Sequence, residues 1–387
     1  MKDKPLVSII INNYNYGRFL NEAIDSALKQ AYENIEVIVV DDGSTDNSRE
    51  IIAGYGNKII PVLKENGGQG SAYNAGFLKS HGKFICNLDS DDTLLPEALD
   101  KAISGFENDE IVKVQWPLWV VDKEGNNANE ITTKWTPPEG NLTEMVLHDG
   151  PFYDFNLHTG SVVKRTFLDN ILPMPEPAFR NGGDLYVTTL APLFGQIRNC
   201  MDPLGTYRVH GTNNYAGRLL DNDRIKNYIA RFETNCNALE WYAKKLGYEV
   251  DQELWKKRNF NYLWPHRLLA AKNDIAQMIP EGENYILVNE NEWGEGEPVH
   301  HRHAIFFMEK NGNYDGPPAD EAQAISEFKR LIAAGAGYIV FWWSSFWWFD
   351  HYETFFQYLQ QNCRSILKND QVVIFELQTN KGGMIAE

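Results

Sequence analysis

The sequence predicts an α/β fold in which the first part of the chain forms a mainly parallel sheet. Largely apolar runs at residues 6–11, 36–40 and 84–88 indicate buried strands, and the first has the pattern of a strand buried on both faces. Segments with apolar residues at helical spacing follow the first two runs, and three strand–helix units fit within about eighty residues. The handedness rule for such units favours parallel pairing.

Composition indicates a globular protein that is long enough for two domains. The chain has 387 residues, of which 43% are hydrophobic and 13% aromatic. Its net charge of −17 argues against a nucleic-acid surface and a polybasic membrane patch. The four cysteines show no paired spacing, so we expect reduced thiols.

No segment has the pattern of a signal peptide or of a transmembrane helix. The first residues lack an apolar core, and no uninterrupted apolar run approaches the ~20 residues that span a bilayer. We therefore expect a cytoplasmic protein, either free or peripheral to the inner membrane.

The elements before residue 80 follow in a regular order. A polar loop at 12–17 joins the first strand to a helix at 19–30, and a strand at 36–40 ends in Asp41 and Asp42. A strand with an edge-type proline follows at 58–63. A glycine-rich turn at 66–76 then opens a helix, where free N–H groups can receive phosphate, although the turn matches neither the dinucleotide nor the phosphate-loop motif.

Three carboxylates follow the apolar run at 84–88. Asp89, Asp91 and Asp92 would leave the sheet at its carboxyl edge, where open α/β folds bind ligands. Such a cluster repels itself unless a proton or a cation offsets the charge, and Mg²⁺ prefers oxygen ligands. The alternative is a capped turn before the helix that begins near Pro96.

Four motifs in this order resemble family 2 of the glycosyltransferases. They lie at residues 7–15, 39–46, 66–76 and 82–92, and the resemblance covers roughly residues 5–215. The resemblance implies a GT-A fold, a nucleotide-sugar-binding domain with helices on both faces of a mostly parallel sheet. It also implies a nucleotide-diphosphate-sugar donor, a divalent metal, Mg²⁺ or Mn²⁺, and inversion at the anomeric carbon.

The resemblance also implies the residues that bind the donor. Tyr14 would lie against the base, and Asp42, with Asp41, would accept hydrogen bonds from it. Gly68 and Asn74 of the glycine-rich motif would contact the nucleotide. Asp89 and Asp91 form the Asp-x-Asp pair: Asp91 would bind the metal, and Asp89 would lie near the ribose or the metal. Helix capping is the alternative role for Asp41 and Asp42.

Two later segments complete the expected site. The family usually has Glu-Asp before a helix where this chain has Gly183 and Asp184, so Asp184 alone is left as the general base. Its alternative role is an N-cap of the helix at 185–194. In a segment that resembles the end of the catalytic domain, His210 would coordinate the metal or touch the diphosphate, and Arg208 would supply positive charge.

The rest of the chain predicts a helical connector and a smaller domain. We place the GT-A domain at 1–216, the connector at 217–277 and an accessory Rossmann-like α/β domain of unknown role at 278–387. Four of the eleven tryptophans lie at 339–349. Core packing, an interface between domains or between copies of the chain, and a carbohydrate-stacking surface are the three alternatives for this segment.

Together these features predict a metal-dependent inverting glycosyltransferase. UDP is the first choice of nucleotide, and a glycan or lipid-linked glycan in surface-polysaccharide synthesis is the expected acceptor. One alternative is a nucleotidyltransferase, although the loop at 12–15 lacks the glycine-rich, basic phosphate loop of that class. The other is a catalytically degenerate nucleotide- or glycan-binding module, which the glycine at position 183 would favour.

Overall fold

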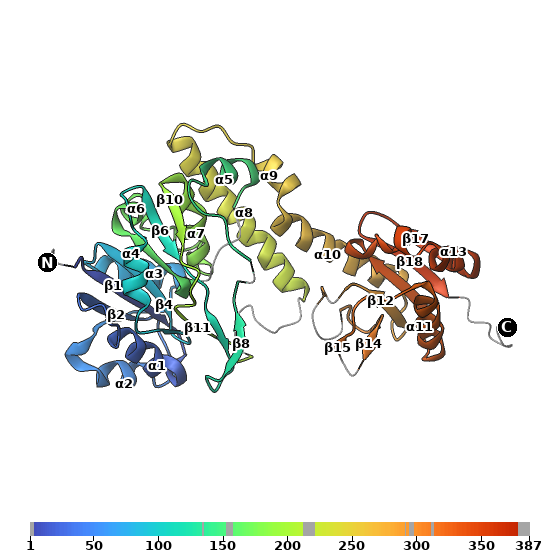
Figure 1. Cartoon of the computed structure of the whole chain (residues 1–387), viewed down its shortest axis with the longest axis horizontal. Coiled ribbons are helices and arrows are strands. Elements are labelled where there is room, and N and C mark those ends of the chain that lie inside the picture. Colours follow the sequence, from blue (N-terminus) through green and yellow to red (C-terminus); the bar gives the residue numbers. More distant parts are fainter. Residues whose placement is uncertain are drawn as a thin grey trace. The chain divides into compact units, whose positions relative to one another are not determined.

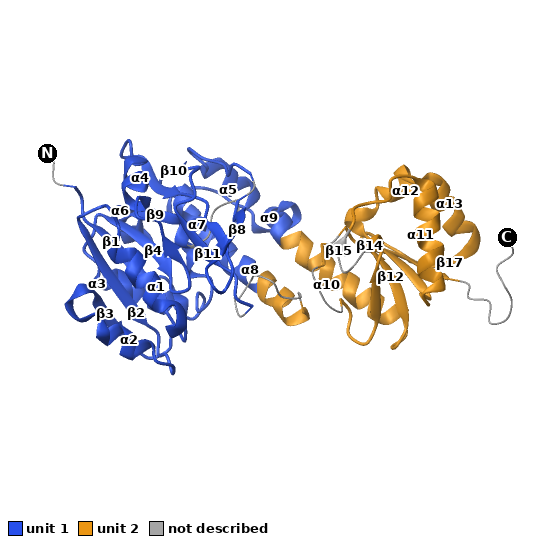
Figure 2. Cartoon of the chain, turned by 60° about the horizontal axis from the view of Figure 1, so that its bottom comes forward, with its two compact units in different colours: residues 1–213, 230–261 blue, residues 214–229, 262–387 orange. Residues whose placement is uncertain are grey.

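The computed structural model divides the chain into two compact units (Figure 2). It describes residues 4–133, 135–151, 158–211, 221–290, 292–293, 298–310 and 313–377. Unit 1 comprises Met1–Asn213 and Ala230–Asn261, and unit 2 comprises Asn214–Ile229 and Tyr262–Glu387. The helices of the expected connector are thus shared between the two units. No helix of the described residues is long and apolar enough to cross a membrane.

Unit 1 is built on a seven-stranded sheet with the order β10-β6-β9-β4-β1-β2-β3 (Figure 1). Its pairs are parallel except that β9 runs antiparallel to both β4 and β6. The predicted α/β class and the mostly parallel sheet are therefore confirmed. The strands are β1 (Val7–Asn13), β2 (Ile35–Asp41), β3 (Ile60–Leu63), β4 (Phe84–Asp89), β6 (Ile111–Gln115), β9 (Ser161–Lys164) and β10 (Gln196–Asn199).

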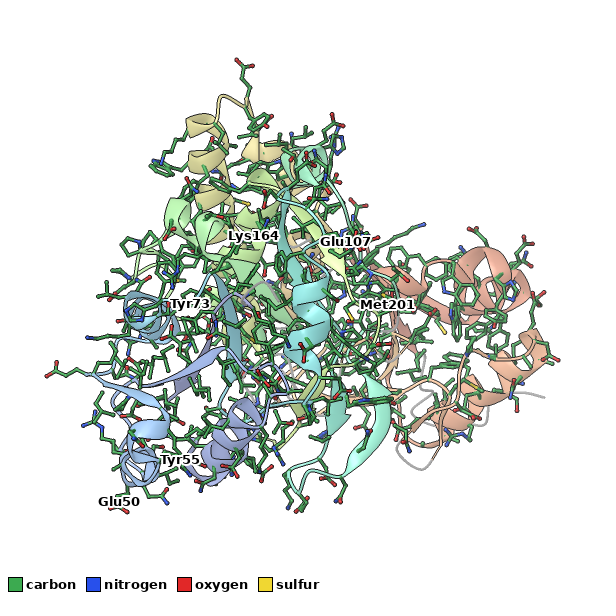
Figure 3. All side chains as sticks on the ribbon, turned by 60° about the vertical axis from the view of Figure 1, so that its left-hand side comes forward. Glu50, Tyr55, Tyr73, Glu107, Lys164 and Met201 are labelled. Carbon is green, nitrogen blue, oxygen red and sulfur yellow. The ribbon has the colours of Figure 1, made fainter. Side chains whose placement is uncertain are left out.

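Helices cover both faces of this sheet because alternate residues of each strand point to opposite sides. Ile9 and Ile11 belong to one core with the buried face of α1. Ile10 points the other way, towards Gly76 of α3, and a Cβ on that glycine would lie 2.5 Å from its Cγ2 atom. On the same helix, Tyr73, labelled in Figure 3, is fully buried and accepts a hydrogen bond from Asn87 of β4.

The helices of unit 1 begin and end close to the predicted positions. The helix expected at 19–30 is α1 (Gly17–Leu28), and the glycine-rich turn opens α3 (Gln69–Lys79). The others that lie wholly or partly in this unit are α2 (Ser48–Gly54), α4 (Ala98–Ser104), α5 (Thr143–Asp149), α6 (Arg165–Ile171), α7 (Gly183–Leu190), α8 (Asn222–Lys245), α9 (Gln252–Arg258) and α10 (Phe260–Met278).

A second, four-stranded sheet lies beside the acidic cluster and has the order β5-β11-β7-β8. Its strands are β5 (Thr93–Leu94), β7 (Trp119–Val121), β8 (Asn127–Ile131) and β11 (Gly205–Arg208). The pairing of β11 with β5 brings the segment that ends at Arg208 against the residues that follow Asp92. This small sheet therefore joins two parts of the expected site that are about 115 residues apart in sequence.

Unit 2 contains a five-stranded sheet with the order β13-β12-β16-β18-β17 and hydrophobic cores on both faces. This sheet and the helices that follow its strands agree with the α/β character expected for residues 278–387. The strands are β12 (Asn284–Val288), β13 (His303–Phe306), β14 (Glu309–Lys310), β15 (Asn313–Tyr314), β16 (Tyr338–Trp342), β17 (Cys363–Lys368) and β18 (Val372–Leu377), and the helices are α11 (Glu321–Ala333), α12 (Trp348–His351) and α13 (Glu353–Asn362).

Candidate functional site

The carboxyl ends of three neighbouring parallel strands meet at one edge of the unit 1 sheet. In register, Asn12 of β1 lies between Val40 of β2 and Asp89 of β4. The side-chain amide of Asn12 is buried, and neither its oxygen nor its nitrogen has a hydrogen-bond partner among the described residues. Because buried amides are normally paired, this edge has unused hydrogen-bonding capacity where a ligand can bind.

The acidic cluster divides into one buried and two partly exposed carboxylates. Asp92 is buried, accepts hydrogen bonds from the Thr159 hydroxyl (2.6 Å) and the Arg208 backbone N–H (3.0 Å), and so supports the turn. Burial, followed by the charges of Asp91 and Asp89, raises the pKa of Asp92 well above its usual range. Asp89 and Asp91 are therefore the cluster members whose side chains reach the solvent.

The structure brings His210 to Asp91, as the resemblance implies. The Nε2 atom of His210 lies 3.0 Å from Oδ2 of Asp91, and its Nδ1 atom lies 3.2 Å from Nη2 of Arg18. A guanidinium can only donate, so Nδ1 accepts and the proton lies on Nε2, facing Asp91. His210 can bind a cation through Nε2 only in the other tautomer, which requires the Arg18 contact to open.

Asp91 and His210 together offer two ligand atoms to a divalent cation. Their separation of 3.0 Å is that of the hydrogen bond between them, so a cation would take the place of the proton on Nε2. Among the described residues, no group of three or more Asp, Glu, His or Cys side chains has a geometry that could hold a metal ion. Further ligands would therefore come from other oxygens, such as those of a diphosphate.

The guanidinium group of Arg208 forms its hydrogen bonds with other groups of the protein. It is buried, its Nε donates to the backbone oxygen of Asp91 (3.0 Å), and its Nη1 donates to that of Lys123 (3.2 Å). Its Nη2 donates to the carboxylate of Glu22. Arg208 thus fixes the backbone of the acidic turn, which is a positioning role rather than the free positive charge that we expected.

Asp41 and Asp42 are both buried, and each organises a loop. Asp41 accepts from Arg49 Nε (2.8 Å) and from Asn13 (3.1 Å). Burial opposes ionisation of Asp41, but hydrogen bonds from Ser44, Arg49 and Asn13 outweigh it and lower its pKa.

Asp42 holds the glycine-rich turn in place. Its carboxylate accepts from the backbone N–H groups of Gly67 (2.9 Å) and Gly68 (2.7 Å), from the Asn66 amide (3.1 Å) and from Lys64 Nζ (2.7 Å). These four contacts occupy both carboxylate oxygens, so in this arrangement Asp42 shapes the loop that a nucleotide would approach. Contact between Asp42 and the base stays a prediction.

The other predicted nucleotide-binding residues lie in different surroundings. Tyr14 is half-exposed in the loop after β1, in keeping with a surface on which a base could stack. Gly68 has a φ of +90°, and a Cβ there would lie 2.4 Å from the Arg180 backbone oxygen, so only glycine fits. The side-chain nitrogen of Asn74 donates to the backbone oxygen of Met174, and its side-chain oxygen accepts from the backbone N–H of the same residue. Asn74 is thus engaged with the segment before α7.

The segment that carries Asp184 is attached to the glycine-rich turn. The side-chain oxygen of Gln69 accepts from the backbone N–H groups of Gly182 (2.8 Å) and Gly183 (3.1 Å). A Cβ at Gly183 would lie 3.2 Å from the sulfur of Met174 and 3.4 Å from Cα of Gly70, so the position is tight for any side chain. Close packing against α3 thus accounts for the glycine where the family usually has Glu.

Asp184 lies in the first turn of α7, above a buried lysine. Thr188 is one turn further along α7, and its hydroxyl accepts from Lys113 Nζ (3.2 Å). Lys113 is fully buried, and burial lowers its pKa to about 7, although the charge of Asp184 acts in the opposite direction. The carboxylate of Asp184 therefore interacts electrostatically with the ammonium group of Lys113 whenever that group is protonated.

Sequence reasoning missed four residues that build this site, namely Thr159, Lys64, Gln69 and Lys113. Only Lys113 left a signal, because a lysine between the apolar residues Val112 and Val114 of a predicted strand is seldom buried without a partner. The other three are ordinary polar residues whose partners are distant in sequence or lie in a loop.

The chain is similar to known glycosyltransferases. Residues 8–172 match Glycosyl transferase family 2. An uncharacterized glycosyltransferase of Nostoc sp. is 31% identical over 262 residues, which cover 66% of this chain and 80% of that protein. Chondroitin synthase of Pasteurella multocida is 43% identical over 108 residues, which cover 27% of this chain and 11% of that protein.

A solved structure shares the fold. TarS residues 1–349 of S. aureus, in complex with UDP-GlcNAc, align with a TM-score of 0.50 and 21% identity over 71% of this chain and 76% of that one. The family match and the relative that is 31% identical set aside the nucleotidyltransferase alternative. The four motifs, the GT-A sheet and the match to a relative along most of its length show that the chain belongs to family 2 of the glycosyltransferases.

Proposed function

We propose that the protein transfers a sugar from a nucleotide-diphosphate-sugar, with UDP as the first choice, to a hydroxyl group of a glycan, with inversion at the anomeric carbon. The observation that carries this proposal is the Asp91–His210 pair at the carboxyl edge of the sheet, beside the unpaired amide of Asn12. The UDP-GlcNAc complex of TarS and the name of the P. multocida relative, chondroitin synthase, support the donor and acceptor classes.

Asp91 and His210 are the residues that would hold Mg²⁺ or Mn²⁺, with Asp89 close by. When bound, the ion would offset the negative charge that the diphosphate gains as the glycosidic bond breaks. The protein's own part is to hold the donor in place: Arg208 fixes the backbone of Asp91, and Asp42 fixes the glycine-rich turn.

Asp184 is the proposed general base. Its carboxylate takes the proton of the acceptor hydroxyl as that oxygen bonds to the anomeric carbon, and the bond to the diphosphate oxygen breaks on the opposite face. The contacts of Gln69 with Gly182 and Gly183 support this role, because they attach the Asp184 segment to the turn that faces the donor. Packing of Gly183 against Gly70 also accounts for the absent Glu without loss of the base.

The acceptor that we propose is a glycan or lipid-linked glycan in surface-polysaccharide synthesis. The expected place of action is the cytoplasm, at or near the inner membrane where such precursors are assembled. These two assignments rest on the family and on the composition of the chain.

Calorimetric titration of UDP, with Mn²⁺ and with EDTA, tests the donor site. We expect saturable UDP binding that requires the ion and is lost in Asp91→Asn. Donor hydrolysis and transfer should fall by about 10²–10⁴-fold in Asp184→Asn while UDP binding persists, since a general base contributes by that factor. Asp202→Asn is the control, because Asp202 is an exposed partner of Lys101 in a surface ion pair.

Two results would contradict the proposal. UDP that binds equally well with EDTA, or does not bind at all, removes the metal-assisted donor site. Hydrolysis that is unchanged in Asp184→Asn removes Asp184 as the base, whereas UDP binding without any hydrolysis or transfer by the parent chain returns the degenerate-module alternative.

A further inference from the structure

Unit 2 has a second sheet edge that carries acidic and aromatic side chains. β12 and β16 are adjacent and parallel, with Tyr285 opposite Tyr338 and Val288 opposite Phe341. The segments that follow these two strands therefore leave from the same edge, which is the edge where open α/β sheets bind ligands. Residues 289–293 follow β12, and the tryptophan-rich segment 343–349 follows β16.

Two indole-to-carboxylate hydrogen bonds tie these segments together. The Trp347 indole donates to Oε1 of Glu290, and the Trp342 indole donates to Oε2 of Glu292 at 2.8 Å. Within the described part of the chain, the second oxygen of each carboxylate accepts no hydrogen bond, and neither glutamate forms an ion pair. Each carboxylate is thus anchored by one indole, and its other oxygen has no hydrogen-bond donor among the described residues.

The same segments contain buried hydrogen-bonding groups that the protein leaves unused. The hydroxyl of Ser345 is fully buried, and the indole N–H groups of Trp293 and Trp348 are nearly so. None of these three, nor the hydroxyl of Ser344, has a hydrogen-bond partner among the described residues. Trp348 and Trp293 lie in the cores on opposite faces of the sheet, so the hydroxyls of Ser344 and Ser345, in the same turn as Trp347, are the groups that could meet a polar ligand at this edge.

An exposed aromatic ring completes the set. Trp347 is 38% exposed, whereas Trp342 and Trp348 are buried in the cores on either side of the sheet. Core packing therefore explains Trp342 and Trp348 but not Trp347, which lies beside the rings of His351 (5.3 Å) and Tyr352 (5.9 Å) at the protein surface. An indole that is hydrogen-bonded through its edge presents its face for stacking.

The exposed indole of Trp347 and the carboxylates of Glu290 and Glu292 together indicate the chemical class of the ligand. Apolar C–H faces of a sugar ring stack on an exposed indole, and its hydroxyl groups donate to carboxylate oxygens and accept from hydroxyl and N–H groups. Two glutamates that form no ion pair among the described residues, in a chain with a net charge of −17, disfavour an anionic ligand. A neutral saccharide can stack on Trp347 and donate hydrogen bonds to the carboxylates of Glu290 and Glu292.

We propose that the carboxyl edge of the unit 2 sheet, formed by Glu290, Glu292, Ser345 and Trp347, is a binding site for a neutral oligosaccharide. This site is distinct from the donor site of unit 1. Its use to hold the growing or acceptor glycan rests on the proposed function, whereas the binding itself does not.

The test is a binding measurement on the full chain without nucleotide or metal. Neutral gluco-, manno-, galacto- and N-acetylglucosamine tetrasaccharides are titrated by calorimetry and by saturation-transfer NMR. We expect saturable binding of at least one of them, weakened about tenfold or more in Trp347→Ala and in Glu290→Gln. Trp241→Ala is the matched control, because Trp241 is 57% exposed on α8, far along the chain from this edge, and it should bind as the parent does.

The outcomes separate this proposal from the function proposed above. If no tetrasaccharide binds, or if binding is unchanged in both Trp347→Ala and Glu290→Gln, the site is overturned while UDP binding and transfer are untouched. If the parent chain is a dimer that Trp347→Ala dissociates, and no saccharide competes, the edge is an interface between copies and the proposal also fails. Glu292→Gln, a change at an exposed side chain, gives a further variant that keeps the fold intact.

Discussion

Replacing Lys113 with Met should make the protein more stable at neutral pH, and the gain should shrink as the pH rises. Lys113 is fully buried in β6, where burial lowers its pKa to about 7. In the unfolded chain the same ammonium has a pKa near 10.4. Between these two pH values Lys113 is protonated in the unfolded chain and neutral in the folded protein. The unfolded state therefore binds one more proton, and the free energy of unfolding of the wild-type protein rises with pH.

The magnitude follows from this linkage. Each pH unit within the window of about pH 7 to 10.4 adds up to about 1.4 kcal/mol to the free energy of unfolding of the wild type. From pH 7.5 to 9.5 the sum is about 2.5 kcal/mol, because the group is partly titrated at both limits. Met has a similar length and no charge, so the variant lacks this term and the difference between the two proteins falls by that amount.

Urea unfolding at pH 7.5, 8.5 and 9.5 measures the difference. Subtraction of the two proteins at each pH cancels the titration of all other groups. Lys79→Met, a change of an exposed lysine at the end of α3, is the control and should show a pH-independent difference. A difference between Lys113→Met and wild type that stays constant over this range would refute the reasoning, since Lys113 would then be charged in the folded protein.

Three further predictions concern the site and its support. Asp42→Asn should lower the free energy of unfolding by about 1–3 kcal/mol in urea and weaken UDP binding, because an amide cannot accept all the hydrogen bonds that hold the glycine-rich turn; unchanged stability would contradict this. Asp92→Asn, in metal-free buffer, should raise the free energy of unfolding in urea at pH 7, because the raised pKa of Asp92 makes its ionised form unfavourable in the folded protein. The gain should disappear towards pH 4, where the carboxyl group becomes protonated in the unfolded chain as well. A lower free energy of unfolding at pH 7 would show that the charge is needed. Gly76→Ala should destabilise by about 1–3 kcal/mol by thermal unfolding, because the new methyl would lie 2.5 Å from Ile10; a stabilised variant would mean that the helix can shift.

The parts of the fold that could be predicted are those whose evidence is local. The largely apolar runs at 6–11, 36–40 and 84–88 are buried strands in the structure, because a strand covered on both faces needs apolar residues at most positions. The spatial order of the strands could not be predicted in this way. β9 is only four residues long and lies between β4 and β6, a position that no local pattern specifies.

The candidate site, too, contains features that local sequence patterns predict and features that depend on contacts between distant residues. The Asp91–His210 contact joins residues 119 positions apart and was reached only through the family resemblance. The roles of Asp42 and Arg208 depend on which donors and acceptors the fold brings to them, so the sequence left base contact and free positive charge as the expectations. β17 shows the same limit in unit 2, because its burial pattern is irregular and it pairs with β18 as a hairpin.

The place of β9 in the sheet has a consequence for how unit 1 folds. The half-sheet β3-β2-β1-β4 is complete once residue 89 has been made, and its connections are short. Among the described strands, β9 alone pairs with both β4 and β6, and it lies more than seventy residues further along the chain. On a ribosome the nucleotide-binding half can therefore form early, while β6 and β10 join it only after residues 161–164 have emerged and closed the long loop.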